Sequence, residues 1–459
     1  MGQIIIFLIL SLALMSYFFG KKRAAHIQVQ TRLTALPQFY GYYLAIWCAA
    51  PALIIFSLWT FFEPFLVKNL ILSSFKASYE SNQLSILYAQ IKSIAQGTFF
   101  GTAQENLVIA ADKYNQLISL LVKSKAILSL IILIGCLSFA YKKINQNIRT
   151  REPVEKFLKY FFFSCSLTAV LTTAGIVFSL LFESLRFFSS VNFFDFAFGI
   201  EWNPGRAFVR DSTSQIDQEV LKNSFGAIPL FAGTFFIAFI AMCVAIPIGL
   251  MTGIYMAEYA STNVRKFAKP IIEILAGIPT VVYGFFAALT VGPFIKQIGN
   301  SMGLEVSSES ALAAGLVMGV MIIPFVSSLS DDVINAVPQN LREGSYAMGA
   351  TKSETIKKVI FPAALPGIVG AILLAVSRAV GETMIVVMAS GLAANLTANP
   401  LESTTTITAQ IVMILVGDQQ FGDPKTQAAF ALGISLFVLT LILNILALEV
   451  VKKYREKYE

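Results

Sequence analysis

The chain has 459 residues, of which 56% are hydrophobic and 13% charged, and its mean hydropathy is +0.71. That charged fraction is about half the value for a soluble protein, and several apolar runs reach the ~20 residues that cross a bilayer core, so soluble fold classes are excluded. The net charge of +7 does not indicate nucleic-acid binding, because the basic residues lie in short clusters beside apolar runs.

The cysteine and histidine residues exclude several kinds of metal and catalytic site. The four cysteines all lie inside apolar segments, so neither a disulfide framework nor a metal cluster is indicated. His26 is the single histidine, which excludes histidine-based triads and histidine-rich metal sites. We therefore expect no catalytic residue, no metal site and no cofactor in this chain.

The apolar runs predict nine membrane spans, and hence an all-α polytopic membrane protein. The first run lacks a charged segment before it and a small-residue cleavage site, so we interpret it as a retained span rather than a signal peptide. The predicted spans cover residues 3–19, 43–62, 126–141, 159–184, 227–257, 270–295, 311–329, 366–391 and 428–451.

Basic residues predict which ends of the spans face the cytoplasm, since Lys and Arg concentrate there. Of the 34 Lys and Arg residues, 21 lie in five segments that would share one side. We therefore expect an external N-terminus and a cytoplasmic C-terminus. This orientation requires that the short run 126–141 crosses, and that residues 404–417 form a re-entrant or interfacial segment. The five basic segments are residues 20–42, 141–159, 258–269, 330–365 and 452–459.

Two longer segments are then predicted outside the membrane. In residues 63–125, apolar residues recur at mixed three- and four-residue spacing, which indicates one or two amphipathic helices, or a hairpin broken near residues 97–101. The second segment, residues 185–226, contains an Asn-Pro-Gly turn signal that begins at residue 203.

Residues 330–365 form the longest polar interruption between apolar runs in the C-terminal half. Pro338 suits the first turn of a helix, and we expect a short helix over residues 339–348. Gly349 would end that helix, because glycine readily adopts the left-handed conformation found at helix ends.

A second short helix is expected to follow, up to about Ile360. Thr351 and Glu354 have the spacing of a capping box at its start. Two short helices hinged at a glycine indicate a docking element, although local pattern alone fits an ordinary surface loop equally well. The loop is no nucleotide site, since Gly344 begins a phosphate-loop-like spacing in which Ala350 replaces the required lysine.

Arg378 and Glu382 are the most informative charged residues, because both fall inside the predicted span 366–391. Four-residue spacing would place them on one helix face, so we expect them to pair and to face a protein interior or a water-filled route. The guanidinium of an arginine suits a tetrahedral oxyanion. The alternative is a structural ion pair that fixes helix packing.

Glu273 and the sequence Gly-Ile-Pro at residues 277–279 mark a predicted break in the sixth span. Such breaks often line a transport route, because freed backbone groups need a polar neighbour. An equally good interpretation places Glu273 at the cytoplasmic interface.

The polar loop resembles the cytoplasmic EAA loop of ABC-importer permeases, whose pattern is E-A-A, three residues, G, nine residues and I-x-L-P. The chain keeps Glu343, Gly349 and Pro362 at the expected spacing. It departs mildly, with Gly344 and Ser345 in place of the two alanines, and with valine and phenylalanine in place of the isoleucine and leucine.

Further segments resemble the PstC subunit of phosphate ABC importers. The resemblance covers about residues 160–456 and leaves out residues 1–155. The segments that carry it are residues 199–204, 254–260, 269–287, 337–351 and 377–384.

This resemblance implies a six-helix permease core at residues 159–456, with the coupling loop at residues 330–365, preceded by about three extra N-terminal transmembrane helices. The preceding part would hold two helices in residues 1–62, the periplasmic helical segment 63–125, and a third helix with its cytoplasmic linker in residues 126–158.

The resemblance also implies a function and partners. The chain would import inorganic phosphate across the bacterial cytoplasmic membrane by alternating access, while ATP hydrolysis would occur in a separate subunit. Partners would be two ATP-binding subunits, a second permease of the PstA type, a periplasmic phosphate-binding protein and membrane lipid, without nucleic acid. The phosphate route would include Arg378, Glu382 and Glu273. Coupling residues would be Glu343, Gly344, Ser345, Ala347, Gly349, Ala350, Thr351 and Pro362.

Two alternatives stay open at this point. One is a permease for another oxyanion, such as sulfate or molybdate. The other is a membrane sensor or scaffold that reads a ligand with residues 63–125.

Overall fold

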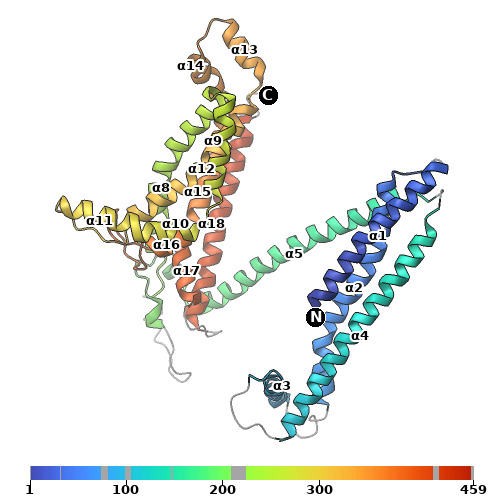
Figure 1. Cartoon of the computed structure of the whole chain (residues 1–459). Helices are drawn as coiled ribbons and strands as arrows, with labels where there is room; N and C mark the ends of the chain where they lie inside the picture. The colour runs from blue at the N-terminus through green and yellow to red at the C-terminus, as the bar shows by residue number, and fades with distance from the viewer. Residues whose placement is uncertain are drawn as a thin grey trace. The chain divides into compact units, whose positions relative to one another are not determined.

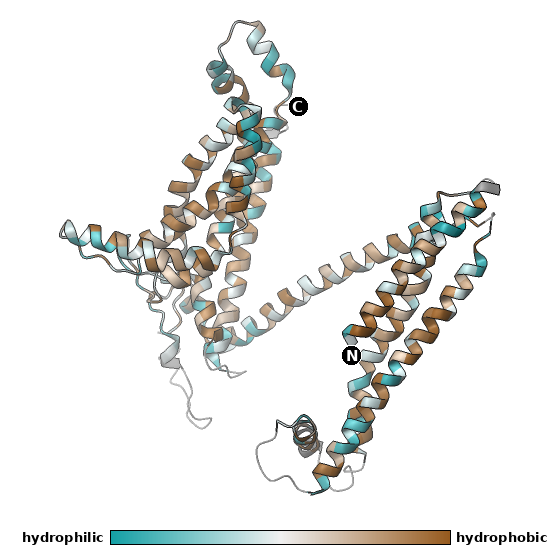
Figure 2. Cartoon of the chain, viewed as in Figure 1, coloured by the Kyte–Doolittle hydropathy of each residue, from teal (hydrophilic) through white to brown (hydrophobic). Residues whose placement is uncertain are grey.

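The described part of the chain is helical. No β-strand forms within it, and an isolated bridge pairs Trp202 with Phe225. Nine helices there are long and apolar enough to cross a membrane, which confirms the predicted all-α polytopic class. Figure 2 shows apolar residues along the middles of the long helices and polar residues near their ends. The computed structural model describes residues 2–30, 33–73, 81–98, 105–145, 148–207, 224–416 and 423–455.

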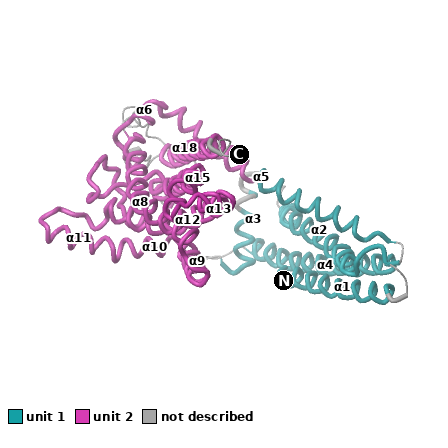
Figure 3. The backbone as a smooth tube through the Cα atoms, turned by 90° about the horizontal axis from the view of Figure 1, so that it is seen from above, with its two compact units in different colours: residues 1–171 teal, residues 172–459 magenta. Residues whose placement is uncertain are grey.

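The chain divides into two compact units, residues 1–171 and 172–459 (Figure 3). The long helix α5 (Arg151–Ser190) begins in unit 1 and ends in unit 2. Unit 1 otherwise contains α1 (Gly2–Gln30), α2 (Pro37–Leu72), α3 (Ser81–Ala95) and α4 (Glu105–Lys143).

Two glycines allow α1 and α2 to approach closely. A Cβ atom on Gly20 would lie 2.7 Å from the carbonyl oxygen of Tyr40, and one on Gly41 would lie 2.8 Å from the carbonyl oxygen of Tyr17. Small residues permit such close contact between membrane helices. The apolar residues buried near this crossing are Ala24, Tyr43, Leu44, Ala140, Ile144 and Val154.

Helices α2 and α4 are longer than a bilayer requires. They contain 36 and 39 residues, or about 54 and 58 Å at 1.5 Å per residue, whereas the hydrocarbon core is ~30 Å thick. Both continue unbroken through residues 63 and 125, so the segment between these positions begins and ends inside helices.

The helix α3 packs against α4 through an apolar cluster that includes Leu87, Ile91 and Tyr114. It ends at Ala95, and Gly97 follows with a φ angle of 70°. The helices α3 and α4 are separate and pack together, whereas residues 99–101 of the predicted hairpin break near residues 97–101 lie outside the described residues.

Unit 2 holds the remaining helices, several of them short (Figure 1). Three π-helical turns, at Tyr255–Tyr259, Ala287–Val291 and Ile356–Ile360, interrupt its α-helices. Its α-helices are α6 (Phe193–Phe198), α8 (Ile228–Ile254), α9 (Thr262–Ala276), α10 (Thr280–Phe286), α11 (Gly292–Ser301), α12 (Ala311–Ala336), α13 (Gln339–Ala347), α14 (Lys352–Thr355), α15 (Phe361–Val380), α16 (Met384–Ala389), α17 (Ile407–Val416) and α18 (Pro424–Arg455).

The centre of unit 2 is the pair α8 and α12, against which α15 also packs. Glycines bring the pair together: a Cβ on Gly253 would lie 2.8 Å from Cβ of Ser330, and one on Gly319 would lie 2.9 Å from the carbonyl oxygen of Ala241. Interiors packed this closely move as one body, since even small shifts create clashes. The helices α8 and α12 therefore form a rigid frame.

The predicted sixth span is wrong at its start. Residues 262–276 form the separate amphipathic helix α9, which buries none of its residues, and the apolar helix begins at Thr280. The predicted break at residues 277–279 is confirmed. Its physical cause is Pro279, which restricts the residue before it to extended conformations.

The predicted eighth span is wrong at its end. The helix α15 stops at Val380, and Met384 begins the six-residue helix α16. In the described part of the predicted re-entrant segment 404–417, which ends at residue 416, the ten-residue helix α17 forms and is too short to cross a bilayer.

Candidate functional site

The polar loop forms two short helices, α13 and α14, beyond one end of the core helices (Figure 1). Gly349 separates them with a φ angle of 84°, a conformation that side chains of L-residues rarely adopt. This confirms the predicted glycine hinge. The second helix does not end near residue 360 but continues through a π-turn into α15, with Pro362 in its first turn.

The predicted capping box begins α14. The Thr351 hydroxyl accepts a hydrogen bond from the Glu354 amide at 3.4 Å, and the Glu354 carboxylate accepts one from the Thr351 amide at 3.0 Å. Each side chain thereby satisfies a backbone donor that the helix itself cannot.

Arg342 attaches α13 to the core and was missed by sequence reasoning. Its Nε and Nη2 atoms donate to Oε1 of Glu258 at 3.2 and 3.0 Å, and both side chains are largely buried, at 11% and 8% exposure. Nη2 also donates to the carbonyl oxygen of Ile334, and Nη1 to that of Val337. The guanidinium thus caps the end of α12, whose last carbonyls have no partner within the helix.

The other residues of α13 are exposed or half-buried. Leu341, Tyr346 and Met348 are exposed, the last at 89%. A Cβ on Gly344 would meet nothing within 4 Å, so this departure from the EAA pattern leaves free space. Ser345, the second departure, is half-buried, and its hydroxyl lies 2.8 Å from that of Thr355. The serine therefore links the two short helices.

The remaining coupling candidates are at least partly accessible to solvent. Glu343 and Ala347 are exposed on α13, whereas Ala350 and Pro362 are half-buried. Four of the eight candidates therefore lie on α13, three form the connection between α13 and α14, and Pro362 lies in the first turn of α15.

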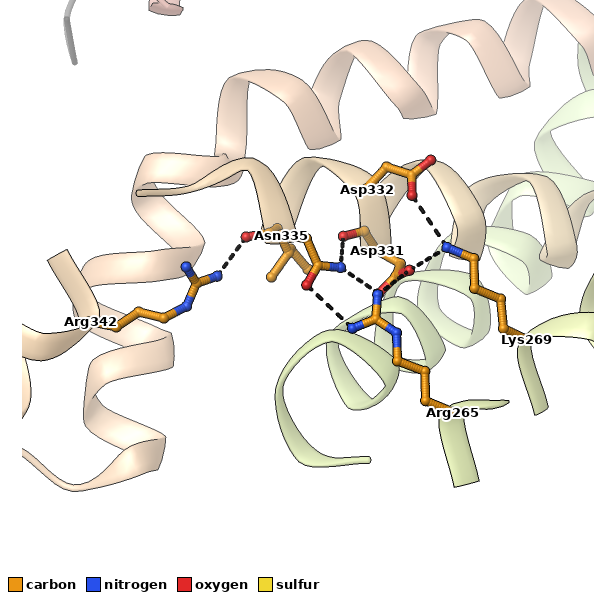
Figure 4. Close-up of polar contacts among 7 residues, drawn as sticks. Arg265, Lys269, Asp331, Asp332, Asn335 and Arg342 are labelled. Atoms are coloured by element: carbon orange, nitrogen blue, oxygen red, sulfur yellow. Dashed lines mark hydrogen bonds and ion pairs between the residues drawn. The ribbon is translucent and has the colours of Figure 1, made fainter. Parts of the chain in front are cut away.

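A polar network at the end of α12 holds the helix α9 (Figure 4). Asp331 is 2% exposed. Nη2 of Arg265 lies 3.0 Å from each of its carboxylate oxygens, and Lys269 Nζ lies 2.9 Å from one of them. The hydrogen bond to Asp331 raises the pKa of Lys269, which keeps the lysine charged. Sequence reasoning missed this network, whose aspartate follows an apolar run.

Arg378 lies in the last turn of α15, and its side chain is exposed. Its guanidinium carbon is 5.6 Å from the centre of the Phe325 ring on α12. Among the described residues Arg378 forms no ion pair. Nearby small residues Ala375 and Ala379 are buried, as expected for close helix contact.

The expected pair between Arg378 and Glu382 is not formed. Glu382 lies beyond the end of α15, in the break before α16, so the two residues do not share a helix face. Its carboxylate instead accepts a hydrogen bond from the Met384 amide at 3.2 Å, and its carbonyl oxygen accepts one from the Thr408 hydroxyl at 2.8 Å.

Glu273 lies on α9, where its side chain is exposed. It lines a narrow cleft together with Lys269 and Asp331, and neither Arg378 nor Glu382 lines that cleft. Glu273 therefore shares this cleft with Asp331, near the end of α12, and not with the two other route candidates.

The described residues contain nine candidate membrane helices, with a pair of short helices beyond one end of the core. This arrangement agrees with a polytopic membrane transport permease. The family model for the binding-protein-dependent transport system inner membrane component matches residues 249–456. A second model, described as a phosphate ATP-binding cassette transporter, matches residues 6–172 and so includes most of the N-terminal part that the sequence resemblance leaves out.

Two relatives of known name indicate which kind of permease the chain resembles. The chain is 32% identical over 285 residues to the probable ABC transporter permease YqgH of Bacillus subtilis, covering 62% of this chain and 86% of the relative. It is 32% identical over 272 residues to the phosphate transport system permease PstC 1 of Mycobacterium tuberculosis, covering 55% of this chain and 80% of the relative. The chain belongs to the PstC-type family of phosphate ABC transporter permeases.

Proposed function

We propose that this chain is the permease subunit that carries inorganic phosphate through an ATP-driven importer by alternating access. Its PstC relatives are phosphate transport system permeases by name, which supports phosphate as the substrate. Hydrolysis of ATP would take place in separate ATP-binding subunits, whose closure would rock the permease between outward- and inward-facing states.

The geometric observation that supports an anionic substrate is the position of Arg378. Its guanidinium lies where α15 stops, against the Phe325 ring, without a carboxylate partner among the described residues. A charged group inside a membrane protein requires a counter-charge or water, and a planar fork of donors matches a tetrahedral oxyanion. Phosphate on its route would supply that counter-charge.

Glu382 and Glu273 are the other proposed route residues. Glu382 fixes the break after α15 through its hydrogen bond with the Met384 amide. Glu273 precedes the second break, at residues 277–279, by one helical turn. Both breaks free backbone groups that a polar route would satisfy.

The test is phosphate uptake by membrane vesicles that contain the assembled importer. Arg378→Gln should lower uptake about tenfold or more, because a hydrogen bond to a charged group contributes about 1.5–3 kcal/mol. The control is Arg186→Gln, which removes an arginine that is 57% exposed and paired within its own helix. Equal uptake by both variants would remove Arg378 from the route.

The same vesicles separate phosphate from other oxyanions. Excess sulfate or molybdate should leave phosphate uptake unchanged. Strong competition by either anion would instead favour a permease for that oxyanion.

We propose that the coupling loop docks on one of two ATP-binding subunits. The second copy of that subunit would bind the corresponding loop of a PstA-type permease. The exposed apolar side chains of Leu341, Tyr346 and Met348 would enter the contact. The residues in contact would be Glu343, Gly344, Ser345, Ala347, Gly349, Ala350, Thr351 and Pro362.

The proposed orientation in the bacterial inner membrane follows from the basic segments. The coupling loop and the C-terminus would be cytoplasmic, the N-terminus external, and a periplasmic phosphate-binding protein would dock on the external side.

A second candidate function is a membrane sensor or scaffold, because α3 and the projecting ends of α2 and α4 form their own apolar cluster. Co-purification separates the two functions: a permease should bring down an ATP-binding subunit, and a sensor should not. The match of residues 6–172 to a phosphate transporter model supports the permease.

A further inference from the structure

The helix α9 differs from its neighbours in how it is held. It buries none of its 15 residues, although it contacts α12. Its exposed residues include Phe267, Ile271 and Ile274. Since burial of apolar surface supplies most of the packing free energy, this helix is held weakly by packing, whereas α8 and α12 interlock through glycines.

The helix α9 is held mainly by polar contacts to one buried carboxylate, that of Asp331. Asp331 accepts from Arg265 and Lys269 on α9, and from Nδ2 of Asn335 at 2.8 Å on its own helix (Figure 4). At 2% exposure, Asp331 depends on these partners for its charge balance. Lys269 and Arg265 are about one-third exposed, so water can replace Asp331 as their partner.

The same end of α12 receives the coupling helix. Arg342 of α13 donates to the carbonyl oxygens of Ile334 and Val337, three and six residues after Asp331. The last two turns of α12 therefore bind α13 through one set of groups and α9 through another (Figure 4).

The helix α9 leads directly into a hinge. It ends at Ala276, and α10 begins at Thr280 after the Gly-Ile-Pro break. The Tyr283 hydroxyl spans the break, donating to the carbonyl oxygen of Leu275 at 3.0 Å. A few residues between two helices, bridged by one hydrogen bond, have the form of a hinge that absorbs backbone rotation.

We propose that Asp331 is a positioning residue for transport, which ties α9 to the coupling helix through the end of α12. Displacement of α13 by the ATP-binding subunits then moves α9 with it and rotates α10 about residues 277–279. Without the carboxylate, α13 still responds to ATP but α9 does not follow. This inference rests on the proposed function as an ATP-driven permease.

The test measures phosphate imported per ATP hydrolysed by the complete importer in vesicles. Asp331→Asn should lower this ratio by about fivefold or more, the lower range of coupling between sites. The matched control is Asp332→Asn, since that neighbouring carboxylate is 64% exposed and lies 3.4 Å from Lys269. A purely structural role would lower uptake and ATPase activity together and leave the ratio unchanged.

A second measurement covers the case in which Asp331→Asn does not assemble. The double variant Arg265→Gln, Lys269→Gln loosens α9 from the other side and should give the same loss of ratio. The substitution Ala276→Cys, in a chain without its four native cysteines, should react with a thiol reagent at an ATP-dependent rate when the contacts to Asp331 are intact. In the double variant the rate should not depend on ATP.

The outcomes separate the two proposals. Absence of phosphate uptake by the unchanged importer would contradict the proposed function. Normal uptake by the unchanged importer, with equal ratios for Asp331→Asn and Asp332→Asn, or an unaltered ATP dependence of labelling, would overturn the role of Asp331 alone.

Discussion

The two units use buried ion pairs in different ways. In unit 1, Lys125 Nζ lies 2.7 Å from the Glu63 carboxylate, and the pair joins α4 to α2, two long unbroken helices. In unit 2, Arg342 and Glu258 join a nine-residue helix to a π-turn. The first pair adds to packing that already exists, while the second is the main attachment of α13, whose one buried residue is Arg342.

This difference indicates which unit can change its conformation during transport. Unit 1 has continuous helices that cross through close glycine contacts. Unit 2 contains helix breaks, π-turns and short helices held by side-chain charge. Because π-turns and breaks often mark functional positions, we expect unit 1 to act as a static part and unit 2 to carry the coupled motion.

The largest effect is expected from Arg342→Met. Removing one partner of a buried pair costs about 3–5 kcal/mol, and here it also frees two carbonyls at the end of α12. Stimulation of ATPase activity by the binding protein should be lost from the purified importer. Full stimulation would show that α13 is positioned by other contacts.

Lys125→Met makes the matching change in unit 1. It removes the charged hydrogen bond to Glu63 and a longer one to the Thr60 hydroxyl at 3.4 Å, with a smaller expected cost of about 1.5–3 kcal/mol. The lysine side chain also lies 5.2 Å from the Phe56 ring, which a methionine can cover. Thermal unfolding should begin at a lower temperature, while phosphate uptake per assembled complex should stay unchanged. A loss of phosphate uptake without a loss of thermal stability would contradict the expectation that unit 1 is static.

Gly349→Val tests the hinge itself and has the smallest expected cost, about 1–2 kcal/mol for a left-handed residue. A Cβ there would meet nothing within 4 Å, so backbone conformation alone is perturbed. ATPase stimulation should weaken while the chain still inserts. Gly344→Ala is the control, because its site is open and its backbone helical, and it should behave as the parent chain does.

Local features were predictable because they depend on neighbouring residues. The nine apolar helices of the described residues each arise from one continuous stretch of sequence. The break at residues 277–279, the capping box at Thr351 and the glycine hinge each depend on a few neighbouring residues. The end of the eighth span was missed because apolar residues resume at Met384, directly after Glu382 and Thr383. Arg378 and Glu382 were therefore interpreted as a pair inside one span, and not as a sign that the helix stops at Val380.

What the sequence by itself determined was membrane class, the number of apolar helices and the form of the coupling loop, since length, hydropathy and capping act locally. What only the tertiary structure decided was which charges meet. Arg342 pairs with Glu258, which is 84 residues away in the sequence, and Arg265 pairs with Asp331, which is 66 residues away. Such partners are chosen by the packing of α8, α9 and α12, because burial makes a charge costly until a distant residue neutralises it.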